Sequence, residues 1–193
     1  VGSFFAATAM AWRLWRFLHL VKRLRVQDRK RNLQNRRLRL LNRALAKRLG
    51  IRRPVDVVVL DSTIGPAIVG LFRPCILLPK VIVERASHAD LKALLAHELV
   101  HFRRGDLWWS TLQAMALAVS WCNPLIWLVS KKFAQEAERC CDEETVAGLG
   151  LDPASYARCL ISVLERKQTL RAAPLLPGVR PVDVTSKRLE RIM

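Results

Sequence analysis

The sequence predicts an α+β fold that is mostly helical, with a small β-sheet and one or more membrane-embedded helices. Most apolar residues recur every three or four positions, which is typical of amphipathic helices. Two short runs rich in Val, Ile and Leu lie between prolines and turn residues, which favours strands. A stretch of 24 residues, 107–130, contains no charged side chain. The 193 residues suffice for one domain with additional segments.

Positive charge is concentrated near the amino terminus. The chain has a formal net charge of +17, and the segment from Arg13 to Arg53 holds 16 Lys and Arg against one acid, Asp28. Such a basic block beside apolar runs favours a membrane surface or nucleic acid as a neighbour. The five cysteines form no CxxC pair, which argues against a disulfide framework and favours a reducing compartment.

The charge pattern divides the chain into three predicted parts. Residues 1–12 are apolar and are expected to form the end of a transmembrane helix. Residues 13–53 are expected to form basic juxtamembrane helices that end near Gly50, and an excess of Lys and Arg beside a span marks the cytoplasmic side. Residues 54–193 then form the remaining domain, which includes a membrane segment at 107–130.

Two strands are expected early in this domain. Residues 55–60 form a β-branched run after Pro54, and residues 75–79 form a second run that Pro79 closes. The strands would belong to one small sheet, with a hairpin around residues 70–74. Because prolines flank the second run, we expect it at the sheet edge.

Helices are expected to fill the rest. Residues 87–90 resemble a capping box that opens a helix, and Gly105 is a natural stop for it. Residues 131–146 are expected to be helical, and Asp152-Pro153 begins a further helix. Prolines between 174 and 181 indicate a loop, and a last helix would start near Ser186.

The uncharged stretch at 107–130 is long enough to cross a bilayer, and tryptophans lie near its ends. We interpret it as a span or a re-entrant segment, and a buried core helix is the alternative. Pro124 is expected to kink or split it.

A metal-binding pattern lies in the helix expected after Ser87. His97 and His101 are four residues apart, so a helix places both imidazoles on one face, with Glu98 between them. The alternative is a helix with two surface histidines. Catalytic zinc usually takes three protein ligands and a water.

The third ligand must come from elsewhere in the chain. His19 in the basic segment and His88 at the helix start are poor candidates. Glu138 and Asp142 share one face of the later acidic helix, so one would bind the metal while the other would hydrogen-bond a ligand imidazole. A solvated acidic surface is the alternative for these two residues.

These residues would support peptide hydrolysis. Glu98 would act as general base on the attacking water, and zinc would polarise the peptide carbonyl. The edge of the small sheet would hold an extended substrate through backbone hydrogen bonds. Asp106 would orient one histidine, although a helix-capping or surface role fits it equally well.

Several blocks together resemble the BlaR/MecR-type membrane zinc metallopeptidases. After the basic segment come GLFRPCILLP at residues 70–79, LLAHELVH at 94–101 and RRGD at 103–106, followed by WCNPLIW at 121–127 and ERCCD at 138–142. The resemblance covers most of the chain from about Arg13 onward. Its Arg-Pro block and Asn123-Pro124 are more specific than the histidine motif alone.

The resemblance implies a gluzincin-like zinc endopeptidase on the cytoplasmic side of a bacterial inner membrane. It matches His97, His101 and Glu138 to the zinc ligands, Glu98 to the catalytic glutamate and Asp142 to the acid beside the site. It also implies a multi-pass protein in signal transduction for antibiotic resistance. The substrate would be the protein itself or a cytoplasmic repressor.

Two other functions are compatible with parts of the sequence. A CAAX- or HtpX-type membrane metalloprotease shares the HExxH and ExxxD patterns but lacks the Arg-Pro block. A nucleic-acid-binding protein would use residues 13–53, yet this block lacks interleaved aromatic residues after Phe17, so nucleic acid is a poor candidate for a partner. The lipid bilayer is an expected partner, and a homodimer stays open.

Overall fold

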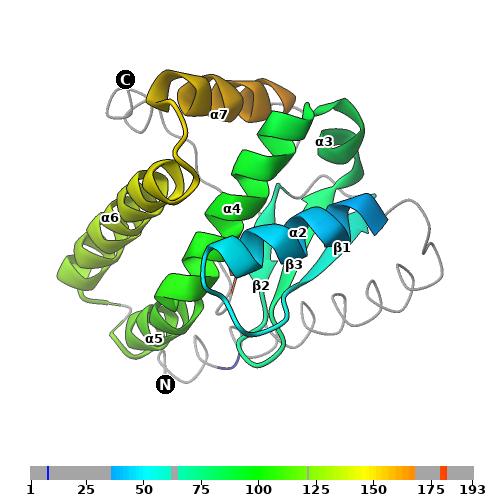
Figure 1. Cartoon of the computed structure of the whole chain (residues 1–193). Helices are drawn as coiled ribbons and strands as arrows, with labels where there is room; N and C mark the ends of the chain where they lie inside the picture. Colours follow the sequence, from blue (N-terminus) through cyan, green and yellow to red (C-terminus); the bar gives the residue numbers. More distant parts are fainter. Residues whose placement is uncertain (1–7, 9–35, 62–64, 121, 168–178, 182–193) are drawn as a thin grey trace.

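The computed structural model describes residues 36–61, 65–120, 122–167 and 179–181, together with Thr8. Its elements follow the order α2 (Arg36–Arg48), β1 (Asp56–Leu60), β2 (Ala67–Val69), β3 (Cys75–Pro79), α3 (Lys80–Arg85), α4 (His88–Arg104), α5 (Asp106–Val119), α6 (Pro124–Leu149), α7 (Pro153–Lys167) and β4 (Val179–Pro181). Helices surround a small sheet, with α4 in the middle (Figure 1). The expected α+β architecture with mostly helical content is confirmed.

The sheet has the strand order β1-β3-β2-β4. β1 runs parallel to β3, and β2 pairs antiparallel with both β3 and β4. The hairpin expected around residues 70–74 is present, between β2 and β3. The expected edge position of residues 75–79 is wrong, because β3 lies between β1 and β2. Pro74 and Pro79 only bound the strand, so its interior keeps its backbone donors.

Helix α4 lies at the centre of the fold, and its middle is buried on all sides. All nine residues from Ala93 to His101 are buried, and α4 packs against α2, α5, α6, α7 and β2. The predicted capping box is confirmed, with Ser87 accepting from the Asp90 amide and Asp90 accepting from the Ser87 amide. Helix α4 ends at the predicted Gly105, which adopts the left-handed conformation.

The amino-terminal helix α2 is docked on this core. Leu38, Leu45 and Leu49 are buried in the main cluster, and the Asn42 side-chain amide donates to the Val55 carbonyl at 2.7 Å. Predictions for residues 1–35, apart from Thr8, and for the helix near Ser186 lie outside the described residues.

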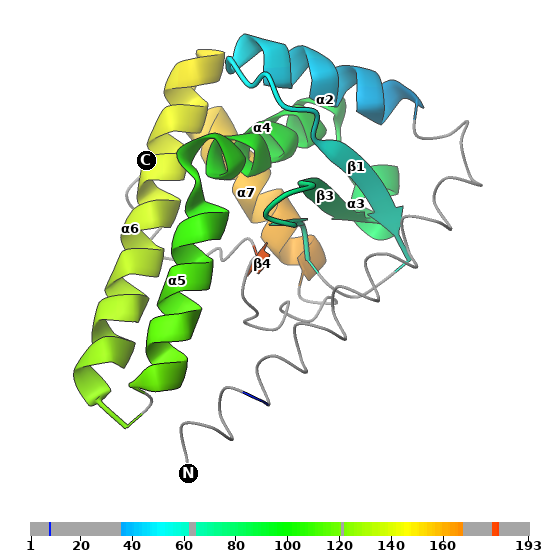
Figure 2. The ribbon, with the colours of Figure 1, turned by 90° about the horizontal axis from the view of Figure 1, so that it is seen from below.

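The uncharged stretch is divided between α5 and α6, which run side by side (Figure 2). Asn123 caps α6 by accepting from the Leu125 amide at 3.0 Å, and Pro124 occupies its first turn. The expectation that Pro124 kinks or splits the segment is confirmed. Among the described helices, none combines the length and apolar character needed to cross a bilayer. The membrane segment expected at 107–130 is thus not one continuous helix.

Candidate metal centre

Two imidazoles on α4 face each other in the interior. His97 and His101 are both about 1% exposed, and their Nε2 atoms lie 3.1 Å apart. The four-residue spacing produces this arrangement, because residues i and i+4 share one face of a helix. The alternative of two surface histidines is therefore wrong.

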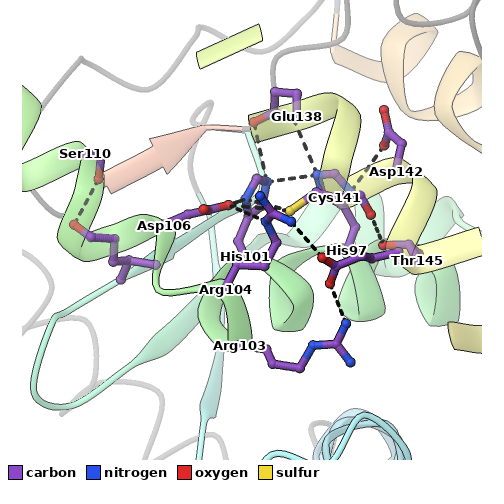
Figure 3. Close-up of polar contacts among 12 residues, drawn as sticks. His97, His101, Arg103, Arg104, Asp106, Ser110, Glu138, Cys141, Asp142 and Thr145 are labelled. Atoms are coloured by element: carbon purple, nitrogen blue, oxygen red, sulfur yellow. Dashed lines mark hydrogen bonds and ion pairs between the residues drawn. The ribbon is translucent and has the colours of Figure 1, made fainter. Parts of the chain in front are cut away.

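Glu138 on α6 joins this pair from across the helix interface (Figure 3). One carboxylate oxygen lies 3.5 Å from His97 Nε2, and the other lies 3.4 Å from His101 Nε2. The ligand atoms of these three buried residues all lie within 4.8 Å of one another. The structure thus brings together the three residues that the sequence nominated, from segments 37 positions apart.

The spacing of these donors fits a tetrahedral zinc ion. Zinc binds imidazole nitrogen and carboxylate oxygen at about 2.0–2.2 Å, so neighbouring ligand atoms should be separated by about 3.3–3.5 Å. The two imidazole nitrogens are 3.1 Å apart, and each lies at such a distance from a different oxygen of the Glu138 carboxylate, 3.5 Å for His97 and 3.4 Å for His101. The residues present therefore fit the metal that the sequence implied.

Asp106 lies behind His101, on the side away from Glu138. Its carboxylate accepts from His101 Nδ1 at 2.7 Å. Gly105, with φ of 74°, turns the chain sharply between α4 and α5, so that a residue only five positions after His101 can return to it. This contact is the histidine-orienting one anticipated for Asp106, rather than a surface position.

The negative charges around His101 favour its cationic form. Burial opposes a charged imidazole, but the negative charge of Glu138 and the hydrogen bond to Asp106 outweigh it and raise the pKa of His101 well above its usual value. The Cys141 thiol lies 3.0 Å from His101 Nδ1, and burial raises the pKa of this thiol to about 11. Cys141 is thus a neutral neighbour at physiological pH.

Asp142 and Tyr156 make the corresponding contacts behind His97. Asp142 Oδ1 lies 3.4 Å from His97 Nδ1. The Tyr156 hydroxyl lies 3.1 Å from the same nitrogen and donates to Asp142 Oδ1 at 2.8 Å. The sequence analysis did not include Tyr156 among the site residues. A signal was available, because a buried tyrosine hydroxyl usually finds a polar partner.

A second group of possible donors consists of His101, Asp106 and Cys141. Its spacing does not suit zinc. A shared zinc ion would hold nitrogen and sulfur about 3.6 Å apart, and nitrogen and oxygen about 3.4 Å apart. The observed 3.0 Å and 2.7 Å are hydrogen-bonding distances. We therefore assign Asp106 and Cys141 to the support of His101 rather than to a metal.

Ion pairs between α4 and α6 hold the two halves of the site together. Glu144 on α6 binds Arg104 at 2.6 Å and also binds Arg103. Partial burial opposes its negative charge, but the two guanidinium groups outweigh that and lower the pKa of Glu144.

The catalytic candidate Glu98 lies on α4 directly after His97 and is fully buried.

Comparison with known proteins assigns the chain to a family. A family model described as BlaR1 peptidase M56 matches residues 3–193. The chain belongs to this family. It is 30% identical over 144 residues to the regulatory protein BlaR1 of Bacillus licheniformis, covering 73% of this chain and 24% of that protein. It is 27% identical over 82 residues to the methicillin resistance mecR1 protein of Staphylococcus aureus, covering 42% of this chain and 14% of that protein.

The family match confirms the resemblance drawn from the sequence motifs, and it favours the BlaR/MecR type over the CAAX and HtpX types. The chain spans about a quarter of the length of the BlaR1 relative.

Proposed function

We propose that this chain is the catalytic part of a zinc-dependent endopeptidase. The observation that carries the proposal is the buried triplet of His97, His101 and Glu138, whose mutual distances suit a tetrahedral zinc ion. Three protein ligands leave one coordination position for water or substrate, which is the pattern of catalytic rather than structural zinc.

The roles of the residues follow from their placement. Zinc bound there would lower the pKa of a water molecule and polarise a peptide carbonyl. Glu98 would accept the proton of the attacking water and pass it to the leaving amine. Asp106 and Cys141 would orient His101, while Asp142 and Tyr156 would orient His97, so that both Nε2 atoms stay directed at the metal.

The substrate would bind as an extended strand beside the site. The segment Val179–Pro181 already pairs antiparallel with β2, and it packs against α5, the helix that begins with Asp106. An extended segment of the same chain at this edge supports strand addition as the mode of binding. It also supports self-cleavage as one reaction of the enzyme.

The biological setting is inferred from the relatives. We place the enzyme in a multi-pass protein of a bacterial inner membrane, with the zinc site facing the cytoplasm. The names of the relatives describe regulation and methicillin resistance. These names support a role in signal transduction for antibiotic resistance, in which the chain would cleave itself or a cytoplasmic repressor.

The deciding experiment compares the whole chain with two variants. We expect the purified chain to contain zinc and to cleave itself or an added peptide, and a chelator should abolish cleavage. Glu98→Gln should keep zinc and lose activity by about 100-fold or more. Glu136→Gln, an exposed glutamate on α6, should behave as the parent. Equal activity in Glu98→Gln and the parent would refute the proposed role.

A further inference from the structure

The hairpin of α5 and α6 has an apolar tip that projects from the rest of the molecule (Figure 2). The Gln113 side chain donates to the Ser130 carbonyl at 2.8 Å, so these two residues lie at the same level of the hairpin. We define the hairpin tip as residues 114–120 and 122–130, which lie beyond this level. The tip contains no charged side chain, and its large exposed apolar residues are Met115, Val119, Leu125, Trp127, Leu128 and Val129.

These side chains surround the tip instead of forming one stripe. On α6, Trp127, Leu128 and Val129 are consecutive and are 54–64% exposed, so together they cover most of the circumference of the helix. A protein partner that docks in a groove needs one apolar face. Apolar residues on all sides suit an environment that is itself apolar on all sides, namely lipid acyl chains.

Charged and aromatic residues begin where the tip ends. Lys131 and Lys132 follow Ser130 directly and are exposed. Trp109 and Phe133 lie beside these lysines, with ring centroids 6.4 Å apart. Lysines that can reach lipid phosphates, together with aromatic rings, are typical of a membrane–water interface. From Pro124 to Lys131, α6 rises about 10 Å, which is a fraction of one leaflet.

We propose that the hairpin tip enters the hydrocarbon of a single leaflet, with Lys131 and Lys132 at the phosphates of anionic lipids. The occupant of this surface is therefore a bilayer rather than a second copy of the chain. This inference does not depend on the peptidase activity.

The same geometry sets the distance of the metal centre from the membrane surface. Glu138 lies seven residues beyond Lys131, which places it about 10 Å further along α6 and outside the bilayer. A consequence that rests on the proposed function is that the enzyme acts on peptide segments close to the membrane surface.

The orientation also separates α2 from the bilayer. Arg48 at the end of α2 donates to the Leu149 carbonyl at the end of α6, and α2 and the hairpin tip lie at opposite ends of the molecule in Figure 2. Leu149 is about 27 Å beyond Lys131 along α6. That distance exceeds the length of about 8–10 Å over which salt screens charges, so the basic residues of α2 would not contact the lipid. This arrangement differs from the juxtamembrane position that the sequence predicts for residues 13–53, of which α2 is part.

Photocrosslinking to lipid tests the proposal in the full chain. The photoreactive residue p-benzoylphenylalanine replaces Leu128, Glu136 or Leu40 in turn, and the protein is illuminated on vesicles of phosphatidylethanolamine and phosphatidylglycerol. Leu40 on α2 is the matched control, because it and Leu128 are both 56% exposed. We expect acyl-chain adducts, identified by mass, from position 128 alone.

Three outcomes would overturn the proposal: no lipid adduct at position 128, equal adducts at positions 128 and 40, or protein–protein adducts at position 128. A second comparison tests the lysines. Replacing both by glutamine should lower the adduct yield at position 128 by about tenfold on these vesicles, and an unchanged yield would refute their contact with anionic lipid. Because none of these readouts requires cleavage, they fail independently of the proposed enzyme activity.

Discussion

Tyr156→Phe removes a single oxygen atom from the support of the metal centre. The Tyr156 hydroxyl contacts His97 Nδ1 at 3.1 Å and donates to Asp142 at 2.8 Å. Phenylalanine retains the aromatic ring in its buried position, so the packing of α7 should be preserved. The substitution therefore tests the hydrogen bonds of Tyr156 with little change to the hydrophobic core.

The expected effect on zinc affinity is moderate. Loss of a group that orients a ligating histidine typically weakens metal binding by 10–100-fold. Asp142 stays 3.4 Å from His97 Nδ1 and retains part of the orienting effect. We therefore expect a loss of about tenfold, near the lower limit, which corresponds to about 1.4 kcal/mol.

Competition with a fluorescent zinc chelator measures this affinity directly. Ser162→Ala is the matched control, because it removes a hydroxyl group from the same helix, α7. Among the contacts described, this hydroxyl donates only to the nearby Cys159 carbonyl. Circular dichroism would establish that both variants are folded. If Tyr156→Phe binds zinc as tightly as Ser162→Ala does, Tyr156 does not position His97.

Three further substitutions test neighbouring parts of the account. Asp106→Asn should weaken zinc binding by about tenfold or more, because His101 Nδ1 loses its carboxylate partner, and the same chelator assay measures it. Glu144→Gln should lower the free energy of unfolding at pH 7 by about 0.5–1 kcal/mol. Since the folded state lowers the pKa of Glu144 below its ordinary 4.5, this contribution is present above that value and disappears as the pH falls through the lowered pKa. Urea titrations at pH 7 and at about pH 3 should therefore show a difference between variant and parent only at pH 7. Gly105→Ala should cost about 1 kcal/mol, because φ is 74° there, and calorimetry should show the melting temperature about 2–4 °C lower. An unchanged melting temperature would argue against that turn.

Local signals in the sequence were sufficient to predict the bounds of several elements. The bounds of β3 and α4 follow from proline, the capping box and Gly105, because each of these residues acts on its immediate neighbours. The start of α7 also follows from Asp152, which accepts from the Ser155 amide. These elements form where the sequence pattern places them.

Long-range pairing was harder to predict. The three-residue strands β2 and β4 are too short to show a period of two, and β4 forms by pairing with β2, which is distant in the sequence. The parallel pairing of β1 with β3, which places β3 inside the sheet, also depends on tertiary structure. Proline at both ends of a strand was therefore a poor guide to an edge position.

The sequence likewise predicts some residues of the candidate site and not others. The pair His97 and His101 follows from helical spacing. The need for a third ligand points to Glu138 or Asp142, and the family resemblance selects Glu138. The role of Cys141 and the identity of the polar partners of Tyr156 could not be predicted, because they depend on how α6 and α7 pack against α4. A single sequence does not specify that packing.

X-ray absorption spectroscopy of the zinc-loaded chain identifies the ligands of the metal. If zinc binds His97, His101 and Glu138, the spectrum contains only nitrogen and oxygen ligands at about 2.0–2.2 Å, including two imidazoles, and Glu138→Ala weakens zinc binding much more than Glu136→Ala does. A zinc–sulfur distance of about 2.3 Å would contradict this set of ligands, because the metal would then lie between His101, Asp106 and Cys141 rather than between His97, His101 and Glu138.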